Sequence, residues 1–135
     1  MNIGQAAKLS GITAKMIRYY EEIGLIAFVK RTDAGYRVYS EQDLKTLKFI
    51  KHSRELGFSI EQIKELISLW KNTDRQSAEV KQLALQHISE LNEKIKKLQE
   101  MVDTLKSSIA CCAGDESPEC HILQNIELGE YPAHT

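Results

Sequence analysis

The 135-residue chain has few of the residues and runs that mark several protein classes. It has two prolines and seven glycines, too few for a collagen-like or low-complexity chain. Its longest apolar stretch, residues 23–29, falls far short of the about 20 residues that span a bilayer. No apolar run follows Lys8, as a secretory signal requires. With 42% hydrophobic and 27% charged residues, the composition fits one folded domain, which we expect to be soluble, cytoplasmic and without a membrane partner.

Cysteines and catalytic motifs are also scarce. The three cysteines all lie between Cys111 and Cys120, which is not a disulfide framework. In a reducing compartment such a local cluster more often indicates metal or redox chemistry. The sequence has no paired-carboxylate pocket, glycine-rich phosphate loop or nucleophile elbow, so we predict that the chain is not an enzyme.

Basic residues are absent after Lys106, although the formal net charge is only −1. Residues 1–60 hold ten Lys and Arg against six Asp and Glu, whereas residues 61–135 hold eight against thirteen. This asymmetry favours a polyanion partner for the N-terminal half. A random fluctuation of surface charge explains the imbalance equally well until the placement of the charges is considered.

The first 24 residues read as two short helices joined by a tight turn. Asn2 with Gln5 forms a capping box, and Ser10-Gly11-Ile12 is the turn. Thr13 then caps a second helix that is expected to run to Gly24. This pattern is typical of a helix-turn-helix.

The second helix carries a polar face suited to DNA. Lys15, Arg18, Tyr19 and Glu22 share one side by helical spacing, which would suit a helix lying in the major groove. An arginine there can bond a guanine edge or clamp a phosphate, and the sequence leaves both open. Taken alone, this helix is better interpreted as a solvated amphipathic helix. The neighbouring segments decide whether it is instead a DNA-binding helix.

A basic hairpin follows the second helix. Ile26, Phe28 and Val29 begin a strand-like run, residues 33–35 give a turn signal, and a second strand is predicted over residues 36–39. The hairpin carries three cations, Lys30, Arg31 and Arg37. Beside a helix-turn-helix it predicts a wing that holds phosphates next to the groove.

Another helix pair follows the wing. Ser40 with Asp43 starts a helix through Leu56, and Ser59 with Gln62 starts the next. The residues expected to face inward are Leu44, Leu47, Ile50, Ile60, Ile63, Ile67 and Trp70. Arg54, near the end of the first of these helices, could reach the DNA backbone, and Trp70 is expected to anchor the core or a subunit contact.

A long helix is predicted from Ser77 to Ala110, after a polar break over residues 71–76. At about 1.5 Å per residue it would be about 50 Å long. Its apolar residues recur in alternating steps of four and three, the heptad seam of a coiled coil: Ala84, Ile88, Leu91, Ile95, Leu98, Val102, Leu105 and Ile109. Packing back on the chain's own N-terminal domain could cover only part of the seam, so we predict a symmetric homodimer.

The cysteine loop comes directly after this helix. Seven residues separate Cys112 from Cys120, enough for the loop to bring both sulfurs together. Two soft thiolates suit a monovalent ion, which favours Cu(I), Ag(I) or Au(I), whereas Zn(II) normally takes four ligands. Asp115 lies within this acidic loop, and Cys111 is interpreted as auxiliary. A reversible disulfide, a zinc site that includes His121, and inert thiols are the alternatives.

Taken together, these segments resemble the MerR family of dimeric transcription regulators. The matching pieces are Asn2-Ile3-Gly4, the helix with Ile17-Arg18-Tyr19-Tyr20-Glu21, the wing from Asp33 to Tyr39, Leu56-Gly57-Phe58-Ser59, and the long helix. The match covers residues 1–127, and within the family the two-cysteine loop is most similar to the copper-efflux branch. The family's divalent-metal members have a cysteine where this chain has Ser77, and a serine there implies a two-coordinate, monovalent-selective site.

The resemblance implies a mainly α fold. It would have an N-terminal winged helix-turn-helix, a long dimerisation helix in an antiparallel coiled coil, and a C-terminal metal loop with a short helix. The expected segments are 1–70 for DNA binding, 71–76 as linker, 77–110 for dimerisation, 111–127 for the metal loop and short helix, and 128–135 as tail. The short helix is expected from Cys120 to Ile126, with Ile122 and Leu123 coupling metal to DNA geometry.

The resemblance also implies a Cu(I)-responsive activator of copper-efflux genes that distorts promoter DNA for RNA polymerase. The expected metal site is Cys112 and Cys120, supported by Ser77 and Asp115. The expected DNA-binding residues are Lys15, Arg18, Tyr19, Tyr20, Lys30, Arg31, Tyr36, Arg37 and Arg54. A thiol redox regulator, a divalent-metal regulator and a metal buffer with no DNA role are the rival hypotheses.

Overall fold

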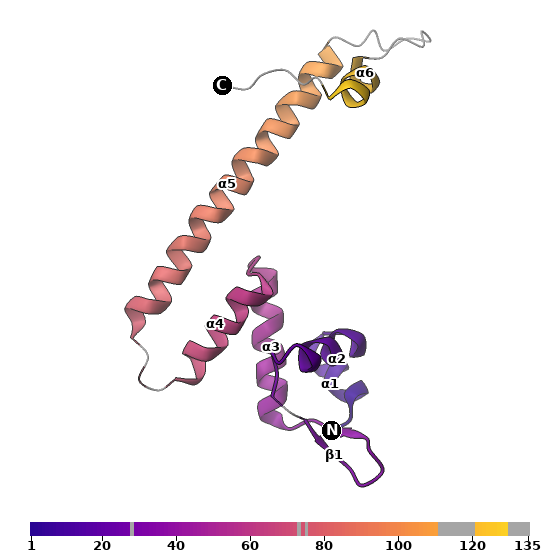
Figure 1. Cartoon of the computed structure of the whole chain (residues 1–135), viewed down its shortest axis with the longest axis vertical. Helices are drawn as coiled ribbons and strands as arrows, with labels where there is room; N and C mark the ends of the chain where they lie inside the picture. The colour runs from indigo at the N-terminus through magenta and orange to yellow at the C-terminus, as the bar shows by residue number, and fades with distance from the viewer. Residues whose placement is uncertain (28, 73, 75, 111–120, 130–135) are drawn as a thin grey trace. The chain divides into compact units, whose positions relative to one another are not determined.

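The computed structural model describes residues 1–27, 29–72, 74, 76–110 and 121–129. The chain divides into two compact units, Met1–Lys81 and Gln82–Thr135. The elements are α1 (Ile3–Ser10), α2 (Ala14–Glu22), β1 (Lys30–Arg31), β2 (Arg37–Val38), α3 (Glu41–Glu55), α4 (Ile60–Lys71), α5 (Ser77–Ala110) and α6 (His121–Leu128) (Figure 1). Among the described residues, no helix has the length and apolarity needed to cross a membrane.

The predicted helix-turn-helix is confirmed as α1 and α2. The Asn2 side chain accepts a hydrogen bond from the Gln5 backbone N–H (2.8 Å), and the Gln5 side chain accepts one from the Asn2 N–H (2.9 Å). Gly11 ends α1 with a φ of 76°, a conformation that residues with a Cβ avoid. Thr13 then caps α2 through the Met16 N–H. Each cap satisfies one of the first-turn N–H groups that have no acceptor within the helix.

The connection between α2 and the wing differs from the prediction. Leu25, Ile26 and Val29 do not form a strand; they are buried core residues. The backbone N–H groups of Leu25 and Ile26 both donate to the Tyr20 carbonyl, which closes the C-terminal end of α2. Because those bonds hold this backbone against the helix, the strands begin only at Lys30. Phe28 lies outside the described residues.

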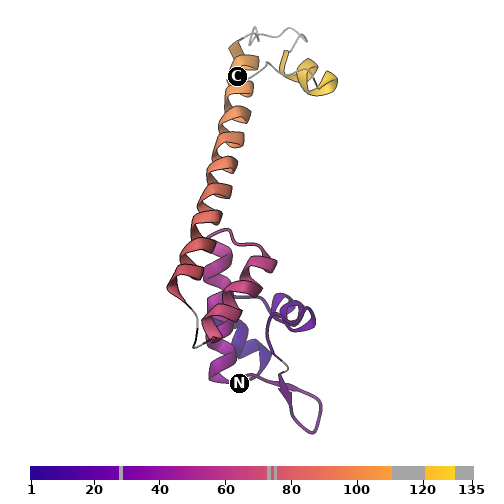
Figure 2. The ribbon, with the colours of Figure 1, turned by 60° about the vertical axis from the view of Figure 1, so that its left-hand side comes forward.

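The hairpin itself is short. Lys30 pairs with Val38 and Arg31 with Arg37 in an antiparallel ladder. Gly35, with a φ of 88°, lies in the turn and donates its N–H to the Thr32 carbonyl. In two views the hairpin extends away from the helices as a narrow loop (Figures 1 and 2).

The predicted capping boxes of the second helix pair are also confirmed, at Ser40 with Asp43 and at Ser59 with Gln62. In the first unit α1 packs on α2 and on α3, and α3 packs on α4. The core comprises Ala6, Ile12, Ile17, Tyr20, Leu25, Ile26, Val29, Tyr39, Leu47, Ile50, Ile63 and Ile67. Trp70 is half-buried and stacks on Phe49, with ring centroids 4.4 Å apart. The stacking makes Trp70 a packing residue between α3 and α4.

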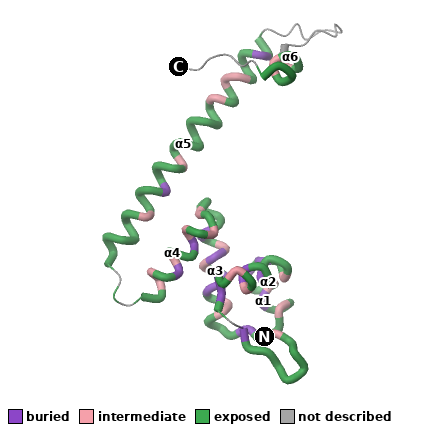
Figure 3. Tube along the Cα trace, in the orientation of Figure 1, coloured by how far each residue is buried: buried purple, intermediate pink, exposed green. Residues whose placement is uncertain are grey.

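The predicted seam of α5 is exposed along the single chain. Six of its members, Ile88, Ile95, Leu98, Val102, Leu105 and Ile109, are 43–62% exposed, and the helix is coloured as exposed over most of its length (Figure 3). Leu85 and Met101 flank the seam and are similarly exposed. An apolar stripe of this length without cover is unfavourable in water.

In the second unit α6 contacts the C-terminal end of α5. The Asn125 side-chain amide donates to the Ser108 hydroxyl (3.2 Å), which in turn donates to the Thr104 carbonyl (3.0 Å). The helix runs to Leu128, two residues beyond the predicted end at Ile126. The residue predicted to start it, Cys120, lies outside the described residues.

Candidate nucleic-acid interface

The polar face of α2 is exposed as the spacing predicts. Lys15, Arg18, Tyr19 and Glu22 all lie on the surface of the first unit, whereas Ile17 is fully buried. Two cations and an aromatic ring therefore project from one side of a nine-residue helix. Such a surface offers donors to base edges and phosphates in a major groove.

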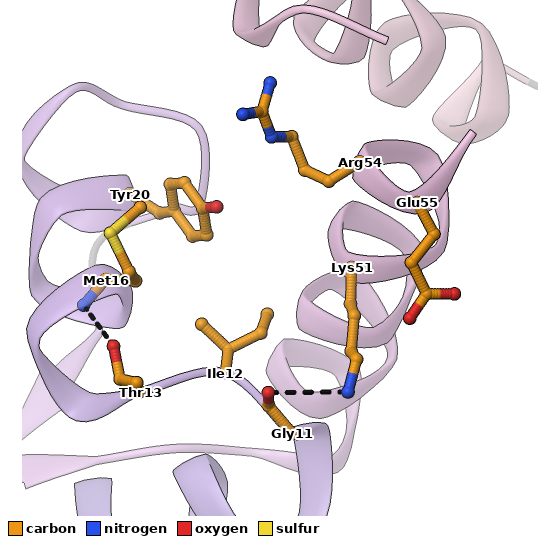
Figure 4. Close-up of a pocket in the computed structure, with 8 residues that line it drawn as sticks. All are labelled: Gly11, Ile12, Thr13, Met16, Tyr20, Lys51, Arg54 and Glu55. Carbon is orange, nitrogen blue, oxygen red and sulfur yellow. Dashed lines mark hydrogen bonds between the residues drawn. The ribbon is translucent and has the colours of Figure 1, made fainter. Parts of the chain in front are cut away.

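A cleft of about 430 Å³ lies between the N-terminal end of α2 and the second half of α3. Its lining residues are Gly11, Ile12, Thr13, Met16, Tyr20, Lys51, Arg54 and Glu55 (Figure 4). The first-turn N–H groups of a helix such as α2 lack intrahelical acceptors and favour an anion. Lys51 and Arg54 add two positive charges, against one negative charge from Glu55. The cleft is therefore suited to hold a phosphate of the DNA backbone.

Tyr20 is more deeply placed than expected of a DNA-contacting residue. The residue is only 5% exposed and belongs to the core. Its hydroxyl is directed into the cleft, on the same side as the guanidinium of Arg54 (Figure 4). Tyr20 can therefore offer DNA its hydroxyl but not its ring.

Sequence reasoning missed Lys51, because only Arg54 had been selected on this helix. The Lys51 ammonium lies against the Gly11 carbonyl at 3.4 Å, which joins α3 to the turn of the helix-turn-helix. A Cβ at position 11 would displace the flexible end of the Lys51 side chain, but it is the φ of 76° that makes glycine the favoured residue there. The signal in the sequence was the spacing of three between Lys51 and Arg54, which places both on one face of a helix.

The wing presents two cations and one aromatic side chain outward. Lys30 and Arg31 are exposed, and Arg31 donates to the Gly35 carbonyl across the turn (3.1 Å). Tyr36 is 73% exposed. These three side chains have the surface positions that a phosphate-binding wing requires.

Arg37 is placed differently from the other predicted wing residues. Its Nε donates to Glu21 Oε2 on α2 at 2.8 Å, and the two side chains are 26% and 12% exposed. Tyr39 lies fully buried two residues further along. Burial, together with the negative charge of Glu21, raises the pKa of the Tyr39 phenol, while Arg37, Arg18 and Arg31 oppose the shift. Because of its ion pair with Glu21, the Arg37 side chain is directed at α2 and not outward like Lys30 and Arg31.

The predicted metal residues fall largely outside the described residues. Cys111, Cys112, Asp115 and Cys120 all lie within the undescribed range 111–120. Ser77 is the exposed first residue of α5. In the part of the chain that the structure describes, no group of three or more His, Cys, Asp or Glu side chains could hold a metal ion. The metal site therefore stays a prediction.

The predicted coupling residues lie on α6. Ile122 is half-buried, whereas Leu123 is 66% exposed. Ile126 and Leu128 are exposed as well. Of the two predicted coupling residues, only Ile122 is thus partly covered in the single chain.

An exposed cationic helix, a basic wing and a cleft lined by Lys51 and Arg54, all on one helical unit, define a DNA-binding protein of the winged helix-turn-helix class. Comparison with known families agrees, because the model of the MerR HTH family regulatory protein matches residues 1–69 and the model described as MerR, DNA binding matches residues 44–107. The chain belongs to the MerR family of transcription regulators.

Individual relatives cover nearly the whole chain. It is 52% identical over 129 residues to the heavy metal-dependent transcription regulator 2 of Rhizobium meliloti (strain 1021), covering 96% of this chain and 88% of that protein. It is 39% identical over 126 residues to the HTH-type transcriptional regulator CueR of Escherichia coli O157:H7, covering 93% of each. Both relatives are named as transcription regulators.

Among solved structures, the chain is similar to the transcription regulator PbrR691 from Ralstonia metallidurans CH34 in complex with lead(II). The TM-score is 0.79 at 28% identity, with 93% of this chain and 98% of that chain covered. The predicted fold class, mainly helical with an N-terminal helix-turn-helix, a small hairpin and a long helix, is confirmed.

Proposed function

We propose that this chain is a Cu(I)-responsive transcription activator that binds promoter DNA as a homodimer, with Ag(I) and Au(I) as alternative ligands. RNA polymerase would act at the same promoter, and the target genes would serve copper efflux. The observation that carries the proposal is a MerR-family chain in which Cys112 and Cys120 enclose a seven-residue loop while position 77 is a serine.

The DNA-binding half of the proposal is supported by the placement of charge. Lys15 and Arg18 on α2, and Lys30 and Arg31 on the wing, lie on the surface of one unit. The cleft beside α2 adds two more cations. Contacts of this kind to phosphates supply most of the affinity for DNA, and the α2 face supplies readout of base edges.

The dimer is supported by the exposed seam of α5. Burying the uncovered half of each Leu or Ile side chain in the seam would contribute roughly 1 kcal/mol. A second copy of the same helix offers a matching stripe, and a twofold dimer presents two DNA-binding units to a twofold site.

The metal half of the proposal is supported by the chemistry of the donors. Two thiolates are soft ligands that suit a two-coordinate monovalent ion, and a serine at position 77 supplies no third thiolate. Helix α6 begins at His121, directly after Cys120 in the chain. The N-terminus of a helix favours nearby negative charge, which would suit a thiolate at Cys120.

The described residues indicate how the loop would act on the rest of the chain. A bound ion would hold the two ends of the loop together, and with them the start of α6. Asn125 ties that helix to Ser108 on α5, so a change at its first turn is passed to the long helix. Differential binding of only about 1–3 kcal/mol between two states is enough for allosteric control.

The test is a metal titration of the anaerobically prepared, reduced protein. We expect one Cu(I) per chain, held by two sulfurs in the X-ray absorption spectrum. We also expect Cu(I) to change the footprint on a DNA duplex that the chain itself has selected from random-sequence DNA. Binding of a four-ligand divalent ion would identify a divalent-metal regulator instead. A response to oxidant but to no metal would identify a redox regulator.

A second prediction concerns the cleft. Lys51→Gln and Arg54→Gln are each expected to weaken DNA binding for all sequences alike, and to reduce the slope of log K against log salt by about 1. Each variant removes one phosphate contact without touching base readout. The measurement is fluorescence anisotropy with the selected duplex over a series of salt concentrations.

The matched control is Lys64→Gln, which removes an exposed lysine from α4 that does not line the cleft. Its salt slope should stay at the wild-type value. Unchanged slopes for both cleft variants would mean that the cleft does not hold a phosphate.

A further inference from the structure

The ion pair between Glu21 and Arg37 joins two elements that both face DNA in the proposed function. Glu21 lies near the end of α2, and Arg37 is the first residue of β2, sixteen positions later. The Nε to Oε2 distance of 2.8 Å is that of a charge-assisted hydrogen bond. Both side chains are mostly shielded from solvent, so the pair is screened less than a surface ion pair.

The alternation of the second strand of the wing explains why Arg37 has this position. Successive side chains of a strand point to opposite faces. Tyr36 and Val38 are exposed, whereas Arg37 is half-buried and Tyr39 is fully buried. Arg37 and Tyr39 therefore share the inner face of the strand, and the outer face is left to Tyr36.

The Glu21 carboxylate also offsets a repulsion between two cations of the hairpin. Arg31 and Arg37 are direct partners in the strand register, and like charges opposite each other destabilise a strand pair. Such partners point to the same face of the hairpin, and Glu21 neutralises Arg37, the more buried of the two. Arg31, in β1, is exposed and remains available as a cation.

We propose that Glu21 and Arg37 form a latch that fixes the wing against α2, and that Arg37 acts on DNA through this latch and not by clamping a phosphate. Glu21 is then a positioning residue for DNA binding. The proposal rests on the proposed DNA-binding function. It assigns phosphate contact in the wing to Lys30 and Arg31, whose spacing from the α2 face depends on the latch.

The latch and simple electrostatics predict opposite effects of removing the Glu21 charge on DNA affinity. Removing a negative charge beside a polyanion should strengthen binding. Glu21→Gln is instead expected to weaken binding to the selected duplex about tenfold, since the wing loses its fixed position. The slope of log K against log salt should also fall by about 1 or more, although no cation has been removed.

Glu65→Gln is the matched control, because it removes the same charge from an exposed residue of α4, outside the α2 face, the wing and the cleft. We expect it to bind as tightly as the wild type or slightly more tightly. Glu21→Asp keeps the charge on a side chain one methylene shorter, so it should bind with an affinity between those of the wild type and Glu21→Gln. Thermal unfolding followed by circular dichroism checks that each variant is folded.

A double-variant cycle tests the role of Arg37 itself. If Arg37 acts through Glu21, the variant E21Q/R37Q should bind no more weakly than the weaker of its two single variants. Additive losses would show that Arg37 contacts DNA independently and would overturn the proposal. So would Glu21→Gln binding as tightly as Glu65→Gln. A wild-type chain that selects no duplex at all would instead refute the proposed function.

Discussion

Cys112→Ser and Cys120→Ser are each expected to abolish the Cu(I) response while leaving DNA binding intact. A serine hydroxyl is a hard, protonated donor that cannot replace a thiolate toward a soft monovalent ion. Loss of either sulfur leaves a two-coordinate site with one ligand. Removing a residue that only supports a metal ligand lowers metal affinity roughly 10–100-fold. Removing one of two ligands should lower the Cu(I) affinity by well over that factor.

The measurement is competition for Cu(I) against a chromophoric chelator under anaerobic conditions, alongside anisotropy with the selected duplex. Cys111→Ser is the matched control, because it removes a thiol from the adjacent position. It should retain the Cu(I) affinity and the footprint change. Full copper response in both the Cys112 and Cys120 variants would refute the two-thiol site.

Ile95→Lys is expected to convert the dimer into monomers at micromolar concentration. Ile95 is the most exposed of the six uncovered seam residues, at 62%. The substitution removes apolar burial worth roughly 1.5–3 kcal/mol when complete, and it brings a charge into the seam of both chains. We expect the dimer dissociation constant to rise by more than about a hundredfold.

Sedimentation equilibrium measures the dissociation constant directly. Gln86→Lys adds the same charge to an exposed polar residue of α5 that lies off the seam, and it should remain dimeric. DNA affinity should fall in Ile95→Lys but not in Gln86→Lys. Two linked chains bind their half-sites together at a high effective concentration, and separate monomers lose this advantage. A wild-type chain that sediments as a monomer would contradict the homodimer.

Local signals predicted most of the secondary structure correctly. The capping boxes at Asn2, Ser40 and Ser59 place the starts of three helices, because each box depends only on residues three positions apart. The bounds of α5, Ser77 and Ala110, agree with the prediction as well. Where prediction erred, as at Ile26, the backbone N–H donates to the carbonyl of Tyr20 on α2 and not to a strand partner.

The candidate interface was predicted only in part. Helical spacing correctly put Lys15, Arg18 and Tyr19 on one exposed face of α2. Helical spacing did not distinguish Tyr20, whose ring is in the core, from its exposed neighbour Tyr19. The same holds for Arg37, which has the composition of a phosphate clamp but lies on the inner face of its strand.

The sequence by itself determined where helices start, which helix faces are apolar, and which residues are candidates to bind metal or DNA. All of these depend on spacings of a few residues. Only the tertiary structure decided how the charges are used. Lys51 meets Gly11 across forty positions, and Arg37 meets Glu21 across sixteen. Such contacts are set by how helices and hairpin pack around a shared core, and spacing along the chain carries no record of that packing.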